Sequence, residues 1–253
     1  MPRRLVLVSA LAVATVTLAL AAFAMGAKPG IATTSWGEAQ LDGGFTPKTL
    51  SRTRPTPIAL DISGQVEALP GVHPPALHKL RIETDRNGSL DLEGIPPCAP
   101  FVQDGLTMRE RCKGLIGKGA ASFEIKFPEQ EPIAAEGPLL LFNGSVRGGV
   151  RTLYASIYLT VPTPASIVAT IEVRKIANGR FGTRALVSIP RVAGGSGSLT
   201  SFHVTLAKTL TVEGRKTSPL KLECPNGKIE GRGEALFTDG STTSTEVVQP
   251  CRR

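Results

Sequence analysis

The sequence is poor in the residues from which catalytic, metal and nucleic-acid sites are built. Only 5% of its 253 residues are aromatic, and it has three histidines. It contains no Cys-x-x-Cys pair and no Gly-x-Ser-x-Gly nucleophile motif. Nucleic-acid binding calls for basic residues interleaved with aromatic ones, so nucleic acid is excluded as a partner. We also predict no catalytic residue, no metal ligand and no cofactor.

Four cysteines are present, at positions 98, 112, 224 and 251. An even number suits disulfide bonds in an oxidising compartment, and four cysteines allow three connectivities. We predict the local pairs Cys98–Cys112 and Cys224–Cys251, each closing a short loop that contributes about 3 kcal/mol in the loop-entropy treatment. No histidine lies near any of the four, which argues against zinc.

The N-terminus has the pattern of an export signal. Arg3 and Arg4 precede an uncharged run over residues 5–24, and small residues follow up to Ala27. Residues 1–27 are therefore predicted to be a signal peptide, with an uncleaved membrane anchor as the alternative. Because arginines stay on the cytoplasmic side, both interpretations place the rest of the chain outside the cytoplasm. We expect a secreted or extracytoplasmic protein.

The chain is moderately basic. Its formal net charge is +8, and removal of Arg3 and Arg4 with the signal leaves +6. A basic surface outside a cell favours weak attraction to anionic wall polymers or to a membrane surface.

From Pro57 onward, apolar and polar residues alternate. The clearest runs are residues 123–127, 153–161, 167–173 and 202–206. Side chains of a strand point alternately to opposite faces, so this pattern predicts antiparallel strands with one buried face. We predict an all-β fold over 57–253, an antiparallel β-sandwich of which a jelly roll is one form, with a partly open barrel as second choice. Residues 28–56 show no sustained period and are predicted to be a linker.

Three local elements are predicted in addition. Asn87-Gly88 indicates a hairpin between residues 80–84 and 89–92, and Asn178-Gly179 indicates a second hairpin. Capping-box spacing from Thr107 to Glu110 predicts one short helix over 107–116. The apolar run Leu139–Phe142 is interpreted as a central strand, with a pocket wall as the alternative.

A few residues could take part in catalysis, calcium binding or glycosylation, but each also has a simpler structural explanation. His78 is expected to face inward and His203 outward, while His73 lies in a loop. The alternating oxygens of Asp85, Asn87, Ser89, Asp91 and Glu93 resemble a calcium loop, but a hairpin explains them as well. Asn143-Gly144-Ser145 matches a glycosylation sequon, and we interpret it as a strand end and turn.

Several segments together resemble a group of uncharacterised exported proteins from high-GC Gram-positive bacteria. They are residues 74–77, 85–88, 94–98, 111–119, 141–144 and 189–190. The resemblance covers most of residues 45–251. It implies an exported domain with paired cysteines, and it carries no activity, cofactor or site residue with it.

The sequence therefore favours an exported, non-enzymatic cell-envelope domain with a structural or interaction role. A carrier of a lipid or other small ligand is the second hypothesis, since a β-fold with apolar inner faces can enclose one. An exported hydrolase is the third, with Ser196, His203 and His78 as the residues to mutate first.

Overall fold

The structure is a computed structural model that describes residues 28–99, 111–176, 179–212 and 214–252. The fold is all-β, as predicted, and every strand pair is antiparallel. The strands are β1 Gly30–Thr33, β2 Gly37–Thr46, β3 Thr56–Pro57, β4 Ala59–Ala68, β5 Leu77–Asp85, β6 Gly88–Leu90, β7 Leu115–Ile125, β8 Ile133–Arg147, β9 Val150–Leu159, β10 Ala165–Lys175, β11 Phe181–Ser188, β12 Gly197–Leu206, β13 Leu210–Val212, β14 Arg215–Thr217, β15 Leu220–Leu222, β16 Lys228–Phe237 and β17 Thr242–Pro250. A short 3-10 turn, η1, covers Ala193–Gly195.

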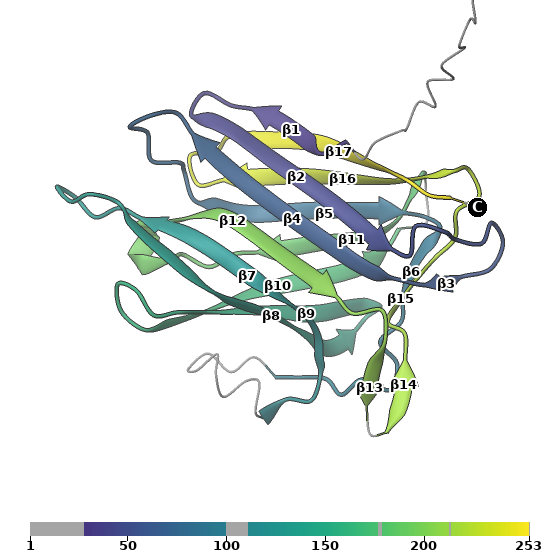
Figure 1. The fold of residues 1–253 in the computed structure, drawn as a ribbon. Coiled ribbons are helices and arrows are strands. Elements are labelled where there is room, and N and C mark those ends of the chain that lie inside the picture. Colours follow the sequence, from purple (N-terminus) through teal and green to yellow (C-terminus); the bar gives the residue numbers. More distant parts are fainter. Residues whose placement is uncertain (1–27, 100–110, 177–178, 213, 253) are drawn as a thin grey trace, which may run out of the picture.

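One sheet contains 12 of these strands, in the order β1-β2-β4-β12-β7-β8-β9-β10-β11-β5-β16-β17. It curls until its two edge strands, β1 and β17, lie side by side (Figure 1), and the backbone of Lys28 there donates to the oxygen of Val248 at 3.3 Å. The sheet is thus nearly closed into a barrel. The barrel and the expected sandwich both have antiparallel strands with one apolar face, but here all the main strands belong to one sheet.

A small second sheet, in the order β3-β15-β6, covers one end of the barrel. Cys224, just after β15, is bonded to Cys251, just after β17, with 6.3 Å between their Cα atoms. Cys98 is bonded to Cys112, with a Cα separation of 5.7 Å. Both predicted local pairs are present. The Cys224–Cys251 disulfide ties the small sheet to the last strand of the barrel.

The predicted hairpin at Asn87-Gly88 is wrong. The strands on either side of Asn178-Gly179, β10 and β11, pair antiparallel as expected, although Asn178 itself lies outside the described residues. After β5 the chain turns out of the large sheet, and β6 pairs with β15 instead. The side chain of Asp85 stabilises this turn: its Oδ1 accepts hydrogen bonds from the backbone and side-chain nitrogens of Asn87 at 2.9 and 2.7 Å. A two-residue turn motif was insufficient to fix the partner of the following strand.

The interpretation of residues 28–56 as a linker is also wrong, because β1 and β2 lie within it and extend the barrel. The alternation of Leu41 and Phe45 along β2 was hidden by Gly43 and Gly44 between them. The first four positions of the predicted helix over 107–116 lie outside the described residues, as does the signal segment 1–27. Of the described positions, 112–114 have no regular secondary structure. The last two helix positions, Leu115 and Ile116, begin strand β7 instead. None of the helices in the described part of the chain is long and apolar enough to span a membrane.

Candidate functional site

The interior of the barrel contains an apolar cavity of about 290 Å³ that is partly open to the outside. Barrel diameter grows with strand number, and about eight strands already leave an interior just wide enough for side chains to fill. Twelve strands therefore need large inward residues to close the interior, yet many inward positions carry small ones. They are Gly43, Ala121, Ala155, Ala169, Ala185 and Gly231, all of which line the cavity.

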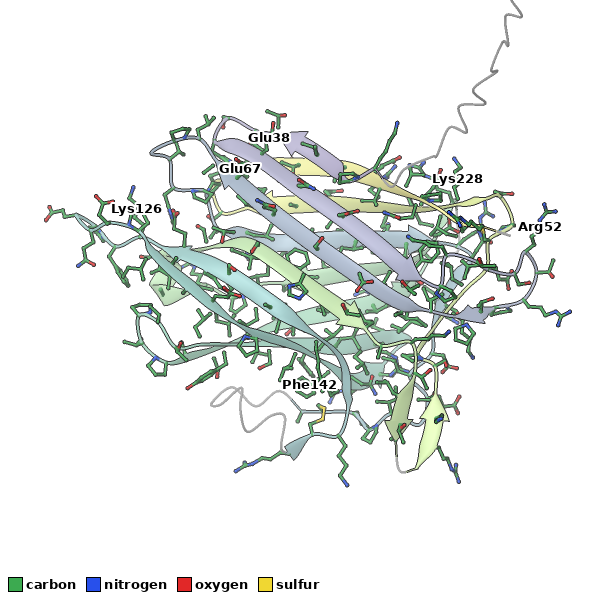
Figure 2. The ribbon with its side chains drawn as sticks, in the orientation of Figure 1. Glu38, Arg52, Glu67, Lys126, Phe142 and Lys228 are labelled. Carbon is green, nitrogen blue, oxygen red and sulfur yellow. A yellow bond between two sulfur atoms is a disulfide. The ribbon has the colours of Figure 1, made fainter. Side chains whose placement is uncertain are left out.

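Strand β8 illustrates how the sequence builds this wall. Leu139 and Leu141 face the cavity, whereas Phe142 is fully buried on the outer face, against the Cys98–Cys112 disulfide (Figure 2). The run Leu139–Phe142 is thus a central strand, as predicted, and its inner side is at the same time a pocket wall. A segment covering the outside of the barrel explains why the run is apolar on both faces.

One end of the barrel is closed by an aromatic cluster. Trp36 and Phe237 meet edge to face with ring centroids 4.8 Å apart, and Leu77 and Leu80 pack with them. These four residues are all buried. The cavity lies on the other side of this cluster and extends to the small β3-β15-β6 sheet, whose Leu90, Leu220 and Leu222 line it.

Polar groups reach the cavity at this second end. Gln249 of β17 is in phase with the inward Val247, is 6% exposed and lines the cavity. Its side-chain oxygen accepts a hydrogen bond from Lys48 Nζ at 3.1 Å, and its side-chain nitrogen donates to Asp42 Oδ1 at 3.4 Å. Lys48 Nζ also lies 4.4 Å from the ring centroid of Phe45, another cavity residue. The cavity is therefore apolar over most of its surface and polar at one end.

Loops at the two ends of the barrel differ in charge. Arg52 and Lys228 lie at the end that carries Gln249, whereas Glu38 and Glu67 lie at the opposite end (Figure 2). Described loop residues around the first end include Lys48, Arg54, Arg86, Arg252 and Glu223, and those around the second include Lys126, Arg191, Glu129, Glu131 and Asp239. The basic charge is thus concentrated near the polar end of the cavity.

A separate polar cluster lies at the opposite end, on the outer face of β7 and β12. Ser198 Oγ is 3.2 Å from His73 Nε2, and His73 Nδ1 is 2.5 Å from Glu124 Oε1. Ser198 and Glu124 are cross-strand partners, and His73 reaches them from the loop between β4 and β5. The order serine, histidine, carboxylate matches that of a catalytic triad.

The surroundings of Ser198 favour a structural latch over a nucleophile. Ser198 is 2% exposed, and its hydroxyl donates to the carbonyl oxygen of Pro74 at 2.6 Å. A hydroxyl has one proton, so while that bond is made His73 Nε2 must act as the donor to Ser198 Oγ. In this arrangement the cluster fastens the β4–β5 loop across the end of the barrel.

The residues singled out from the sequence do not assemble into a site. His203 is exposed on β12 as predicted, and Ser196 lies in the loop before that strand, but neither makes a described contact with His78. The inward placement of His78 is wrong: a register shift opposite Leu236 and Phe237 lets Leu77 take the inner position and leaves His78 exposed. Sequence reasoning missed His73, Ser198 and Glu124, because three separate segments supply them.

The remaining candidates have structural roles. Asp85 is 7% exposed and is bonded to Asn87 and to the backbone of Glu230. Within the described ranges no group of three or more His, Cys, Asp or Glu residues is arranged to hold a metal ion. Asn143 is 1% exposed; its Nδ2 donates to Ile95 O at 2.7 Å, and its Oδ1 accepts from Arg151 at 2.9 Å. Both polar atoms of its side chain are therefore hydrogen-bonded inside the protein.

The outer surface of β5, β11, β16 and β17 carries a network of ion pairs. Arg232 and Arg180 both contact Glu246, and Arg180 also pairs with Glu230. The hydrogen bond from Arg232 holds the pKa of Glu246 below its usual value, and the hydrogen bond from Lys228 does the same for Glu230. The network joins the strands next to the barrel's closing edge.

Comparisons with protein-family models, with curated proteins and with solved structures found no match to this chain. The cavity and its polar end are therefore interpreted from their own chemistry.

Proposed function

We propose that the protein is an exported, non-enzymatic carrier that binds an apolar or amphipathic small molecule inside its barrel. Export is supported by the basic and apolar N-terminal segment and by two disulfide bonds, which suit an oxidising compartment. The ligand-binding part rests on one observation, the apolar cavity of about 290 Å³. This cavity is our reason for proposing a carrier rather than a purely structural protein.

The free-energy cost of leaving the cavity empty favours a bound ligand. At ~24 cal/mol per Å³ of void, a dry cavity of this size would cost about 7 kcal/mol, a large part of the 5–15 kcal/mol by which domains are typically stable. Ordered water needs two to four polar partners, and the polar lining groups are confined to the end near Gln249. An apolar ligand satisfies this surface with no such partners.

The size of the cavity indicates the class of ligand. It is about twice the volume of the ~150 Å³ engineered cavity that binds benzene, and it lies near the lower end of the range of ~300–1,000 Å³ for small-molecule sites. A single acyl or prenyl chain, or a compact ring system, matches this volume better than a two-chain lipid.

Native mass spectrometry of the protein purified from its own host tests the proposal. We expect extra mass in the native spectrum that disappears when the same sample is denatured. The second measurement is equilibrium binding of a fluorescent long-chain probe to the delipidated protein. A native mass equal to that of the bare polypeptide, together with no saturable probe binding, would overturn the proposal.

A cavity residue and an outward-facing residue give a pair of variants for the binding assay. Gly43 faces the cavity, and a β-carbon there would meet only Asp61 O, at 3.7 Å. Thr170 of β10 lies between the cavity residues Ala169 and Ile171 and points to the other face of the sheet. Gly43→Leu should fill the cavity and weaken probe binding at least tenfold, whereas Thr170→Leu should leave it within a factor of two. Equal effects of the two changes would show that the probe binds elsewhere.

A second candidate function, an exported serine hydrolase, is favoured by the cluster of Ser198, His73 and Glu124. For catalysis, the Pro74 carbonyl would have to move away so that Ser198 donates its proton to His73. Labelling with a fluorophosphonate tests this candidate. Covalent labelling of the native protein that is lost in both Ser198→Ala and His73→Gln would support it, and an unlabelled native protein would reject it.

A further inference from the structure

The barrel wall has an incomplete segment between β2 and β17. Strand β1 pairs with β2 only from Glu38 to Leu41. Beyond Leu41, the next backbone link between these two sides within the described residues is at Lys48–Leu50, where Arg252 N donates to Lys48 O at 2.8 Å and Leu50 N donates to Arg252 O at 3.0 Å. Just before β1, Lys28 N donates to Val248 O of β17 at 3.3 Å. Among the described residues, no strand lies between the second half of β2 and the end of β17.

Side chains, rather than a backbone ladder, bridge this stretch. Gln249 connects to Lys48 on one side and to Asp42 on the other. Gly43 and Gly44 contribute no side chain to the wall. A second hollow is lined by residues of β2, β4 and β12 together with Gln249. Residues that line both this hollow and the cavity are Asp42, Gly43, Gly44, Ile62, Val204 and Gln249. The wall between the hollow and the cavity is therefore one residue thick at these positions.

Lys48 is the cation at this position. Its ammonium is held by Gln249 and by the face of Phe45, which is 3% exposed and lines the cavity. Among the described residues no carboxylate lies within ion-pair distance of Lys48 Nζ, although the aspartate at position 42 is bound to the same glutamine. The ammonium is thus positioned at the rim of an apolar cavity with its charge uncompensated by an acidic side chain.

We propose that this stretch of wall is the opening of the cavity, and that the ligand is a single-chain amphiphile with an anionic head bound by Lys48. The proposal rests on the carrier function and specifies its ligand. The apolar chain lies among the inward residues, and the head stays at the opening beside Lys48 and the amide of Gln249. Because the described loop residues at this end include more basic than acidic ones, whereas those at the opposite end do not, an anion is steered to the opening rather than to the opposite end.

The anionic head is a carboxylate or a phosphate monoester, since both can accept hydrogen bonds from an ammonium and a side-chain amide. The test therefore compares three probes of equal chain length: an alkyl carboxylate, an alkyl phosphate and the neutral alkanol, each displacing a fluorescent chain from the full protein. We expect the native protein to bind one or both anions about two- to fivefold more tightly than the alkanol, the range of a solvent-accessible ion pair. Raising the salt concentration should reduce this preference.

Lys48→Gln should abolish the preference by lowering the affinity for the anions to that for the alkanol. A native-like circular dichroism spectrum and a cooperative thermal melt show that the variant is folded. Lys126→Gln, at the opposite end of the barrel, should retain the full preference (Figure 2). The proposal is overturned if the native protein binds all three probes equally, or if Lys48→Gln keeps the preference. These results differ from failure of the carrier function, in which no probe binds and Gly43→Leu has no effect. A preference for the carboxylate alone or the phosphate alone identifies the head group.

Discussion

The ring of Phe202 lies directly over Gly64, its cross-strand partner in the neighbouring strand. A β-carbon on Gly64 would come within 3.0 and 3.1 Å of two of the ring's atoms. The ring is thus folded across β4 instead of extending into the middle of the barrel. This packing preserves the cavity, because the largest inward side chain of β12 occupies the space above a residue that has none.

We expect Gly64→Ala to destabilise the protein, because the new methyl group must displace the Phe202 ring toward the cavity. Overpacking of this kind costs about 1–3 kcal/mol. Gly231→Ala is the matched control, since a β-carbon there would meet only Glu83 O, at an ordinary 3.5 Å. That change should stabilise the protein by about 0.4–1 kcal/mol, because alanine lowers the conformational entropy of the unfolded chain. Urea unfolding of the two variants measures both effects, and a stable Gly64→Ala would refute the packing argument.

The two disulfides should contribute similar stability but differ in their effect on the cavity. Their sequence separations are 14 and 27, for which the loop-entropy treatment gives about 3 and 3.5 kcal/mol. Replacing Cys224 and Cys251 by alanine should also loosen the small sheet that covers the cavity and weaken binding of a long-chain probe. Replacing Cys98 and Cys112 should lower stability while leaving affinity nearly unchanged. Equal losses of affinity would contradict the assigned role of the small sheet.

Asn143 should be needed for folding rather than for modification. Its side chain joins the segment around Ile95 to Arg151 of the next strand, and its backbone is bonded to Cys98 and Gly114. Asn143→Ala leaves the Ile95 carbonyl without its partner in a buried position, which costs about 1–3 kcal/mol. Chemical denaturation should show this loss. A fully stable variant, or a glycan on Asn143 in the folded protein, would contradict the burial of this side chain.

The sequence was sufficient to predict features that depend on one strand at a time, namely where a strand lies and which of its faces points inward. The alternation along residues 153–161 and 167–173 identified β9 and β10 and their inward faces, because side-chain period follows from backbone geometry alone. Local disulfide pairing followed from short loops. Closure of the sheet was not predictable, because it depends on how many strands join. The interpretation of residues 28–56 as a linker left out β1 and β2, because Gly43 and Gly44 interrupt the apolar pattern of β2.

The cavity was predicted only as the alternative to a packed core, and the Ser198 cluster was not predicted, for a related reason. Inward alanines such as Ala155 and Ala169 are consistent with a packed core in a narrow sandwich and with a cavity in a wide barrel, so their meaning depends on the strand number. His73, Glu124 and Ser198 come from three segments that only the folded chain brings together. His78 was placed on the wrong face because one register shift in β5 reverses which residues point inward.

The ion-pair network on the outer face predicts a loss of stability in acid. The pKa values of Glu246 and Glu230 are lower in the folded protein than the ordinary glutamate value of 4.5, through Arg232 and Lys228 respectively. A carboxylate with a lowered folded pKa contributes stability that is complete above its unfolded pKa and is lost as the pH falls through the folded one. Between about pH 5 and pH 7, therefore, the contribution of both groups should be constant.

Glu246→Gln should consequently lower the melting temperature at neutral pH, and the difference from the native protein should shrink as the pH falls below about 4.3. The side chain of Glu246 is 44% exposed, so the effect should be limited to about 0.5–1 kcal/mol, or roughly 1–4 °C for a chain of this length. Glu172→Gln is the control, because Glu172 pairs only with Arg174 of its own strand in the described structure. Thermal melts of the three proteins across this pH range give the comparison. A difference that stays constant down to pH 3 would show that Glu246 acts through packing rather than through its charge.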